Sequence, residues 1–225
     1  MEIWLDTIDC KTIEEGVKAR VIAGVTTNPS ILSKSRDVSQ TLQEILALQP
    51  GPVAVQVTSS DPDKMVEEGL RLFEFSSRLI VKVPITRQGL QAIAQLKQQG
   101  IPIMGTTILS SHQALLASIA QVDYMAPYLS HMEDSTILTT IVALLKASQS
   151  KSKLLVASLR SVDQILFCAS QGVSAITIKP DLYKELVSDQ PAVESFIQTF
   201  KQDWSKTEEK LSNLSCSSSS FCQKD

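Results

Sequence analysis

The alternation of short apolar runs with longer amphipathic stretches predicts an α/β fold: a single (β/α)8 TIM barrel with an extra C-terminal helix. Eight runs of strand length recur between the amino terminus and Lys179, and helix-like segments separate them. A chain of 225 residues, 43% hydrophobic and 20% charged, is long enough to enclose one such core. No GxGxxG motif follows the first run and no GxxxxGK[ST] motif occurs, which disfavours nucleotide-binding sheets.

The predicted strands are rich in Val, Ile, Leu and Ala, as expected for strands that are buried on both faces of a parallel sheet. They are residues 2–6, 24–27, 53–57, 79–83, 101–106, 122–127, 154–158 and 175–179. Several of the helix-like segments between them open with Ser or Asp at a capping position, and Gly100 and Gly172 stand where a helix should stop. These segments include residues 61–76, 87–99, 110–120, 135–148, 161–171 and 181–187.

The chain is expected to divide into a barrel (1–189), one further long helix (190–214) and a disordered Ser-rich tail (215–225). On the long helix, Phe196, Phe200 and Trp204 recur at a spacing of four and form an aromatic stripe that needs burial. Its partner is either the protein's own barrel or a neighbouring subunit.

Composition excludes several classes of partner. A net charge of -3 and few aromatic residues leave neither a basic field nor a stacking platform for nucleic acid. The amino terminus begins as a strand and no apolar run reaches membrane length, so a soluble cytoplasmic protein without a membrane partner is expected. Four scattered cysteines suit free thiols in a reducing compartment.

The first candidate for chemistry is Lys82, which interrupts the β-branched run LIVKVP at residues 79–84. A buried ammonium is costly, and desolvation lowers the pKa of an amine until it can attack a carbonyl carbon. A Schiff-base enzyme is one interpretation. The other is a lysine at the end of a strand that reaches solvent or pairs with a carboxylate.

Polar residues cluster where the predicted strands end, which is where a barrel of this kind carries its reactive groups. They are Asp6, Thr26, Thr27, Asn28, Gln56, Thr58, Lys82, Thr106, Thr107, Tyr128, Ser158, Arg160 and Lys179. The set has no His/Cys cluster at metal-ligand spacing and no paired carboxylates, so neither a metal nor a glycosidase mechanism is expected. Asp6 and residues 26–28 could instead cap helices, and Tyr128 could be a structural phenol.

Two segments resemble the paired signatures of the transaldolase family: GVTTNPSIL at residues 24–32, and IVKVP at residues 80–84 with the later Gly89. The resemblance extends from residue 1 to about residue 210. The short chain, Gly105-Thr106-Thr107 and Ala126-Pro127-Tyr128 are most similar to the small subgroup that contains fructose-6-phosphate aldolase.

The resemblance implies a cofactor-free aldolase or transaldolase of carbohydrate metabolism, acting on sugar phosphates as in the pentose phosphate pathway. Lys82 would form the Schiff base with a ketose such as fructose 6-phosphate, and Asp6 would move protons as the C3–C4 bond breaks. A proton-shuttling water would be bound by Gln56, Thr106 and Tyr128. The dihydroxyacetone unit would be held by Asn28, with Thr26 and Ser158 in the same pocket. Small members of the family form rings, often of five or ten subunits, so a homo-oligomer is implied.

The phosphate site departs from the family pattern. Where family members carry an Arg after the sixth strand, this chain has His131, whereas Arg160 keeps the Ser-x-Arg pattern after the seventh strand. Three functions stay open: an aldolase, a transaldolase that transfers dihydroxyacetone, and an inactive family member that binds ligands.

Overall fold

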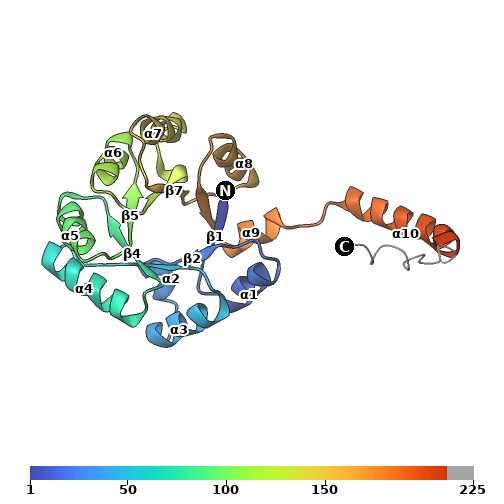
Figure 1. Ribbon diagram of the computed structural model, residues 1–225, viewed down its shortest axis with the longest axis horizontal. Coiled ribbons are helices and arrows are strands. Elements are labelled where there is room, and N and C mark those ends of the chain that lie inside the picture. The colour runs from blue at the N-terminus through green and yellow to red at the C-terminus, as the bar shows by residue number, and fades with distance from the viewer. Residues whose placement is uncertain (212–225) are drawn as a thin grey trace, which may run out of the picture. The chain divides into compact units, whose positions relative to one another are not determined.

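A computed structural model describes residues 1–211, and its strands form a closed barrel in chain order (Figure 1). Each strand pairs in parallel with the next, and β8 pairs with β1 to close the ring. The strands are β1 (Glu2–Asp6), β2 (Gly24–Thr26), β3 (Val53–Gln56), β4 (Leu79–Pro84), β5 (Ile103–Ile108), β6 (Tyr124–Pro127), β7 (Lys153–Val156) and β8 (Ala175–Ile178). The predicted (β/α)8 fold is confirmed.

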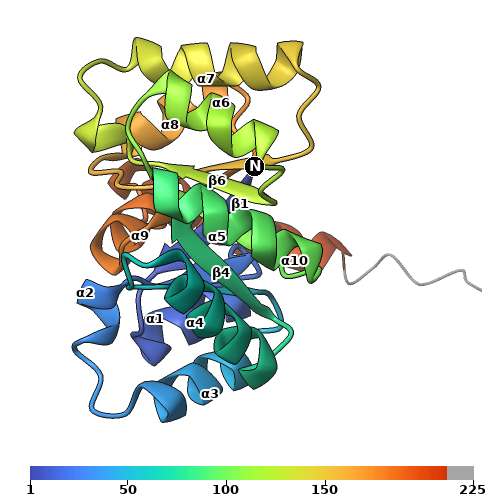
Figure 2. The same cartoon turned by 90° about the vertical axis from the view of Figure 1, so that its left-hand side faces the viewer.

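Helices alternate with the strands and cover the outside of the barrel (Figures 1 and 2). They are α1 (Cys10–Lys18), α2 (Pro29–Leu32), α3 (Val38–Leu48), α4 (Pro62–Phe75), α5 (Arg87–Gln98), α6 (Ser111–Ile119), α7 (Thr136–Ala147), α8 (Val162–Ser170) and α9 (Pro180–Leu186). A short 3-10 helix, η1 (Leu129–His131), follows β6.

Most differences from the predicted helix bounds concern the capping residues. The predicted segments 61–76 and 161–171 included Asp61 and Ser161, but both residues have extended backbone and accept hydrogen bonds from the backbone of the first turn. Gly100 and Gly172, with φ of +72° and +74°, lie just beyond helix ends. In β5 the pairing continues to Ile108 past an irregularity at Thr107, whose φ is +58°, rather than ending at Thr106.

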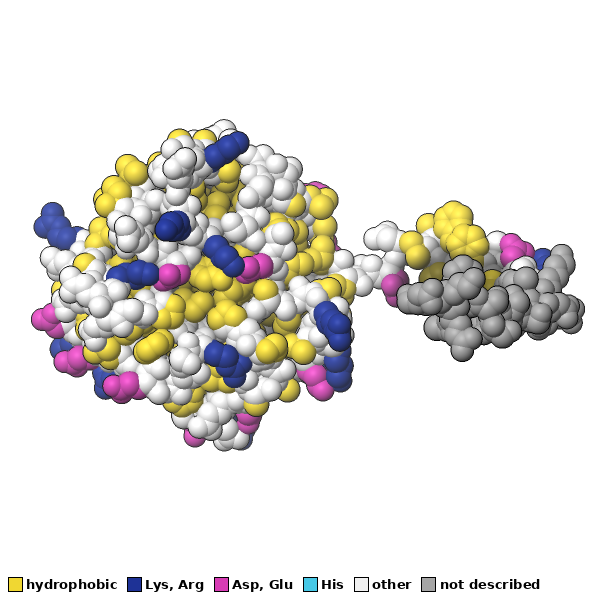
Figure 3. All heavy atoms as spheres, in the orientation of Figure 1, with side chains coloured by type: hydrophobic (Ala, Val, Ile, Leu, Met, Phe, Trp, Pro, Cys, Tyr) yellow, Lys and Arg dark blue, Asp and Glu magenta, His cyan; other side chains and the backbone are white. Residues whose placement is uncertain are grey.

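Contacts divide the chain into two units, Met1–Leu186 and Val187–Asp225. The second contains α10 (Pro191–Leu211), which agrees with the start of the predicted long helix. The predicted tail at residues 215–225 lies outside the described residues. Apolar side chains gather along α10 (Figure 3), and Phe196, Phe200 and Trp204 are all exposed.

The interior of the barrel is filled by one apolar layer. Because side chains alternate between the two faces of a strand, every second residue points inward. The inward cluster contains Trp4, Ala54, Ile80, Met104, Ala126, Leu155 and Ala175, one residue from each of seven strands. A second and larger cluster fills the space between the strands and the helices. The inner layer therefore plugs the barrel below the ends of its strands.

Trp4 is the largest member of this plug, and its size explains Gly24. The register pairs Trp4 with Gly24 on β2, and the indole also packs edge to face on Tyr124 at 5.3 Å between ring centroids. A Cβ at Gly24 would lie 2.8 Å from both the Trp4 ring and the Pro52 carbonyl oxygen. Only glycine leaves room for the indole at this level of the barrel.

We expect Gly24→Ala to lower the free energy of unfolding by about 1–3 kcal/mol, because it overpacks a filled core. Part of that cost should disappear in a Trp4→Leu background, where the ring is gone. Denaturant unfolding of the four proteins gives the coupling between the two sites. If Gly24→Ala lowered the free energy of unfolding equally in both backgrounds, the Trp4 ring would not be the reason that position 24 requires glycine.

Candidate active site

A polar layer lies directly above the apolar plug. Moving two residues towards the carboxyl end of a strand keeps a side chain on the same face. That step leads from Trp4 to Asp6, and from Ile80 to Lys82. The same step on the other strands reaches Thr26, Gln56, Thr106 and Thr177. On these six strands a polar residue therefore stands above the inward layer, whereas on β7 the same step leads from Leu155 to Ala157; the polar residues meet at the carboxyl ends of the strands.

A cavity of about 180 Å³ opens within this layer. Seven of the residues predicted for the site line it: Asp6, Thr26, Asn28, Lys82, Tyr128, His131 and Ser158. Thr177 and Lys179 line it as well. Lys179 is among the polar residues expected at the strand ends, although no role is assigned to it there, whereas Thr177 is not expected. Gln56, Thr106 and Arg160 are not among its lining residues.

Lys82 is a buried lysine: only 5% of its surface is exposed. Its Nζ donates a hydrogen bond of 2.7 Å to the carbonyl oxygen of Thr27, the residue that follows β2. Burial lowers the pKa of the Lys82 amine, and the Asp6 carboxylate opposes this by favouring the charged form. No ion pair within 4 Å joins Lys82 to a described residue. The amine therefore keeps a larger neutral fraction than an exposed lysine, as a nucleophile requires.

Asp6 is held by a chain of hydroxyl groups. Thr26 Oγ1 donates to Asp6 Oδ1 at 2.7 Å, and Thr26 Oγ1 also lies 2.7 Å from Thr177 Oγ1. Since a hydroxyl has one proton and Thr26 gives it to Asp6, Thr177 must donate to Thr26. The chain fixes one oxygen of the carboxylate. Oδ2 accepts no hydrogen bond from the described residues, and Asp6 lines the cavity.

Asn28 caps a helix, as its position in the sequence suggested, and it also lines the cavity. Its Oδ1 accepts a hydrogen bond of 3.0 Å from the Ile31 backbone amide and caps α2. The cap uses the side-chain oxygen, so the amide NH2 remains as a donor. Capping and ligand binding are therefore compatible at this position.

Tyr128 and Thr106 form a hydroxyl pair at the end of β5 and β6. Their side-chain oxygens lie 3.1 Å apart, and the Tyr128 ring lies 6.1 Å from the His131 ring between centroids. Gln56 stands beside Lys82 in the β3–β4 register. It also borders a separate groove between α3 and α4, where Leu42, Leu72 and Phe75 are among the lining residues.

The loop after β7 brings Ser158 to the cavity in an uncommon backbone conformation. Its φ is +60°, a region that is costly for a residue with a side chain and that is often found at functional sites. Two residues later, Arg160 is exposed, and its backbone amide donates to Gln164 Oε1 at 2.7 Å. Arg160 thus lies on the same loop as Ser158 but outside the cavity lining.

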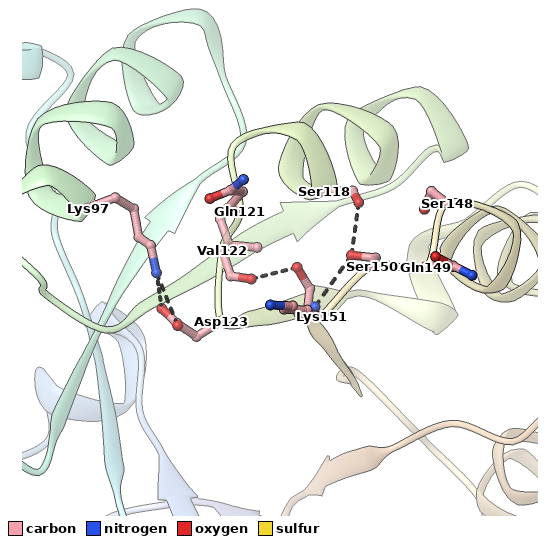
Figure 4. Close-up of a pocket in the computed structure, with 10 residues that line it drawn as sticks. Lys97, Ser118, Gln121, Val122, Asp123, Ser148, Gln149, Ser150 and Lys151 are labelled. Carbon is pink, nitrogen blue, oxygen red and sulfur yellow. Dashed lines mark hydrogen bonds and ion pairs between the residues drawn. The ribbon is translucent and has the colours of Figure 1, made fainter.

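A larger cavity, of about 450 Å³, lies at the opposite end of the barrel (Figure 4). It is bordered by the segments that precede β6 and β7, and its polar groups bind one another. Lys97 Nζ contacts both oxygens of Asp123 at 2.9 and 3.1 Å, and Ser118 Oγ donates to Ser150 Oγ at 2.9 Å. This end of a barrel usually serves stability. The smaller cavity is therefore the candidate active site.

Comparison with known families identifies the family of the chain. The family model described as Transaldolase/Fructose-6-phosphate aldolase matches residues 3–224. The chain belongs to this family. The match supports the class of Schiff-base aldolases and transaldolases without distinguishing between them. Within residues 1–211, no helix is long and apolar enough to cross a membrane, and no three His, Cys, Asp or Glu side chains are grouped as metal ligands.

We expect Asp6→Asn to lower the pKa of Lys82 further. The Asp6 charge raises that pKa, so its removal leaves burial unopposed, and the amine becomes neutral at a lower pH. The pH profile of borohydride trapping with dihydroxyacetone measures the midpoint, which should move to lower pH. Asp63→Asn, on the surface of α4, is the matched control and should not move it. A midpoint that rises in Asp6→Asn would contradict the electrostatic coupling.

Thr177→Val should lower kcat about 2–10-fold with a smaller effect on KM, because the variant removes one hydrogen bond from the chain that orients Asp6. Thr177→Ser restores the hydroxyl and should recover most of the rate. Steady-state kinetics of both variants separate hydrogen bonding from packing. If the Ser variant were as impaired as the Val variant, loss of the hydroxyl alone would not account for the effect.

Proposed function

We propose that the protein is a class I aldolase that cleaves or forms the C3–C4 bond of ketose phosphates such as fructose 6-phosphate. The observation that carries this proposal is Lys82, a buried amine with a lowered pKa at the base of a small polar cavity that Asp6 shares. Membership of the aldolase and transaldolase family supports the same class of chemistry.

The proposed reaction begins with attack of the neutral Lys82 amine on the C2 carbonyl carbon. Uptake of one proton and loss of water then give a protonated imine, with nitrogen double-bonded to C2; the later hydrolysis of the imine returns this proton. A base then takes the proton of the C4 hydroxyl, the C3–C4 bond breaks, and its electron pair moves into the imine to give an enamine. The aldehyde half leaves. Asp6 is the proposed base, because it lines the cavity and its Oδ2 accepts no hydrogen bond from the described residues while the hydroxyl chain fixes Oδ1.

Release of the three-carbon half requires a proton and a water molecule. The enamine takes up a proton at C3, and water then hydrolyses the imine to free dihydroxyacetone and the Lys82 amine. We assign the binding of this water to Tyr128 and Thr106, whose oxygens are 3.1 Å apart, and to Gln56, which pairs with Lys82 in register. Two hydroxyls and an amide supply both donors and acceptors for such a water.

The remaining polar groups would bind substrate. Asn28 would donate to a hydroxyl of the dihydroxyacetone unit through its NH2 group, and Ser158 and Thr26 line the same cavity. We assign the phosphate to Arg160, with His131 contributing when it is protonated. A guanidinium grips phosphate more firmly than an imidazole does.

The alternative is a transaldolase, in which the enamine attacks a second sugar phosphate instead of taking up a proton. A third possibility is an inactive family member with a binding role, which would follow if His131 failed to replace the usual Arg. An assay on fructose 6-phosphate with and without erythrose 4-phosphate distinguishes them. Free dihydroxyacetone identifies an aldolase, an absolute requirement for the acceptor identifies a transaldolase, and no turnover in either mixture identifies a binding protein.

Tyr128→Phe should lower aldol cleavage more than it lowers any transfer activity. The phenol helps to position water, and water is needed to release dihydroxyacetone but not to pass it to an acceptor. The ratio of the two rates, measured on one enzyme preparation, is the readout. Equal losses in both reactions, or no loss in either, would exclude the phenol from the partitioning step.

We further propose a homo-oligomer in which α10 packs on a neighbouring subunit. Phe196, Phe200 and Trp204 are exposed, and the rings of the first two stack with centroids 6.1 Å apart. An apolar stripe of this length is unfavourable in water. A head-to-tail contact through such an arm would generate a closed ring, for which we propose five or ten copies.

Truncation before Gln190 should reduce the oligomer size measured by light scattering, because it removes the proposed arm. A full-length Phe196→Ser/Phe200→Ser variant should have the same effect, whereas Lys201→Ser, next to the stripe, should not. A monomeric wild-type protein, or an oligomer that is unchanged by the truncation, would exclude α10 from the interface.

A further inference from the structure

We infer that Lys179 recognises the anionic group of the substrate and thereby determines specificity for phosphorylated over neutral sugars. The inference rests on the proposed function, but it concerns a residue that the family signatures do not contain. Lys179 lines the cavity of Lys82 and Asp6. Its side chain is exposed, and none of the ion pairs among the described residues involves it.

The two lysines that line the cavity differ in burial, and this difference defines an inner end and an outer end of the cavity. Lys82 is 5% exposed and lies within the barrel, whereas Lys179 is exposed and follows the end of β8. A sugar whose carbonyl carbon reaches Lys82 must therefore enter carbonyl first. The far end of that sugar stays at the mouth, beside Lys179. In a ketose phosphorylated at its last carbon, the far end carries the phosphate.

The backbone holds Lys179 in place while its side chain remains exposed. Ile178, the residue before it, pairs in register with Leu5, so Lys179 follows β8 at the level where Asp6 ends β1. The Lys179 carbonyl oxygen accepts a hydrogen bond of 2.9 Å from the Tyr183 amide. The backbone position of Lys179 is therefore fixed, while its exposed ammonium can change rotamer at the mouth of the cavity.

The charges around the cavity favour this role. During the reaction the Lys82 amine becomes part of the imine, so it is not available to hold a phosphate. Asp6 repels an anion, and Arg160 lies outside the lining. Lys179 is the one remaining lysine of the lining, and an ammonium is a common phosphate ligand. Lys179 thus supplies an anchor within the cavity, in addition to His131 in the lining and Arg160 outside it.

Calorimetric binding of glucitol 6-phosphate and of glucitol tests the inference. Neither compound has a carbonyl group, so binding does not depend on imine formation. The wild-type protein should bind the phosphate ester more tightly than the neutral polyol. Lys179→Met, which keeps the length of the side chain and removes its charge, should weaken binding of the ester by about tenfold or more, as expected for a lost charge-assisted hydrogen bond. Lys179→Arg should retain most of the affinity.

Lys151→Met, at the opposite end of the barrel, is the matched control for loss of one positive charge. The inference fails if Lys179→Met binds the ester as well as the wild type does, if Lys151→Met weakens it equally, or if the wild type does not prefer the ester. These outcomes are independent of turnover. Loss of the proposed function would appear instead as a protein that binds the ester and forms no adduct with dihydroxyacetone.

Discussion

Burial of the Lys82 amine is the interaction on which the rest of the site depends. A charged ammonium at this depth is unfavourable, and the surroundings compensate for only part of that cost. One carbonyl oxygen, that of Thr27, accepts a hydrogen bond from Nζ, and Asp6 contributes at longer range. Desolvation outweighs the effect of Asp6, so the pKa of the amine is lowered while a carboxylate, the proposed base, remains nearby. A direct Lys82–Asp6 ion pair would hold the amine in its charged form and would occupy both groups.

The barrel provides this balance through its layers. Trp4 and the other inward apolar residues exclude water from below, which desolvates the next residue up each strand. On β4 that residue is Lys82, and on β1 it is Asp6. The two strands are not neighbours, so their side chains approach across the interior instead of pairing along the sheet. Thr26 and Thr177 then flank Asp6 from β2 and β8 and fix its orientation.

Much of this arrangement could be predicted from local sequence. The apolar runs identified the strands, and a lysine within such a run indicated an unusual environment. The step of two residues from an apolar to a polar side chain is also visible in Ile80 and Lys82, and the same rule would have drawn attention to Thr177. Helix bounds were less accurate because Asp61 and Ser161 belong to the helical pattern while their backbone lies outside the helix.

Other features depend on tertiary geometry. The contact between Thr26 and Thr177 joins residues 151 positions apart and exists only because β8 closes on β1. The positive φ of Ser158 and the exposed position of Arg160 follow from the path of one loop, which residue types alone do not specify. Lys179 ends its strand like many surface lysines. Its position after β8 was expected from the sequence, but its place in the lining of the Lys82 cavity depends on the closed barrel.

The most direct test of the account is reductive trapping of the imine. Borohydride added with dihydroxyacetone should leave a stable adduct on Lys82, mapped by mass spectrometry of the digested protein. Lys82→Arg should abolish the adduct because a guanidinium stays protonated at any relevant pH. An adduct on Lys179 or Lys97, or none in the wild-type protein, would contradict the claim that the buried amine of β4 is the nucleophile.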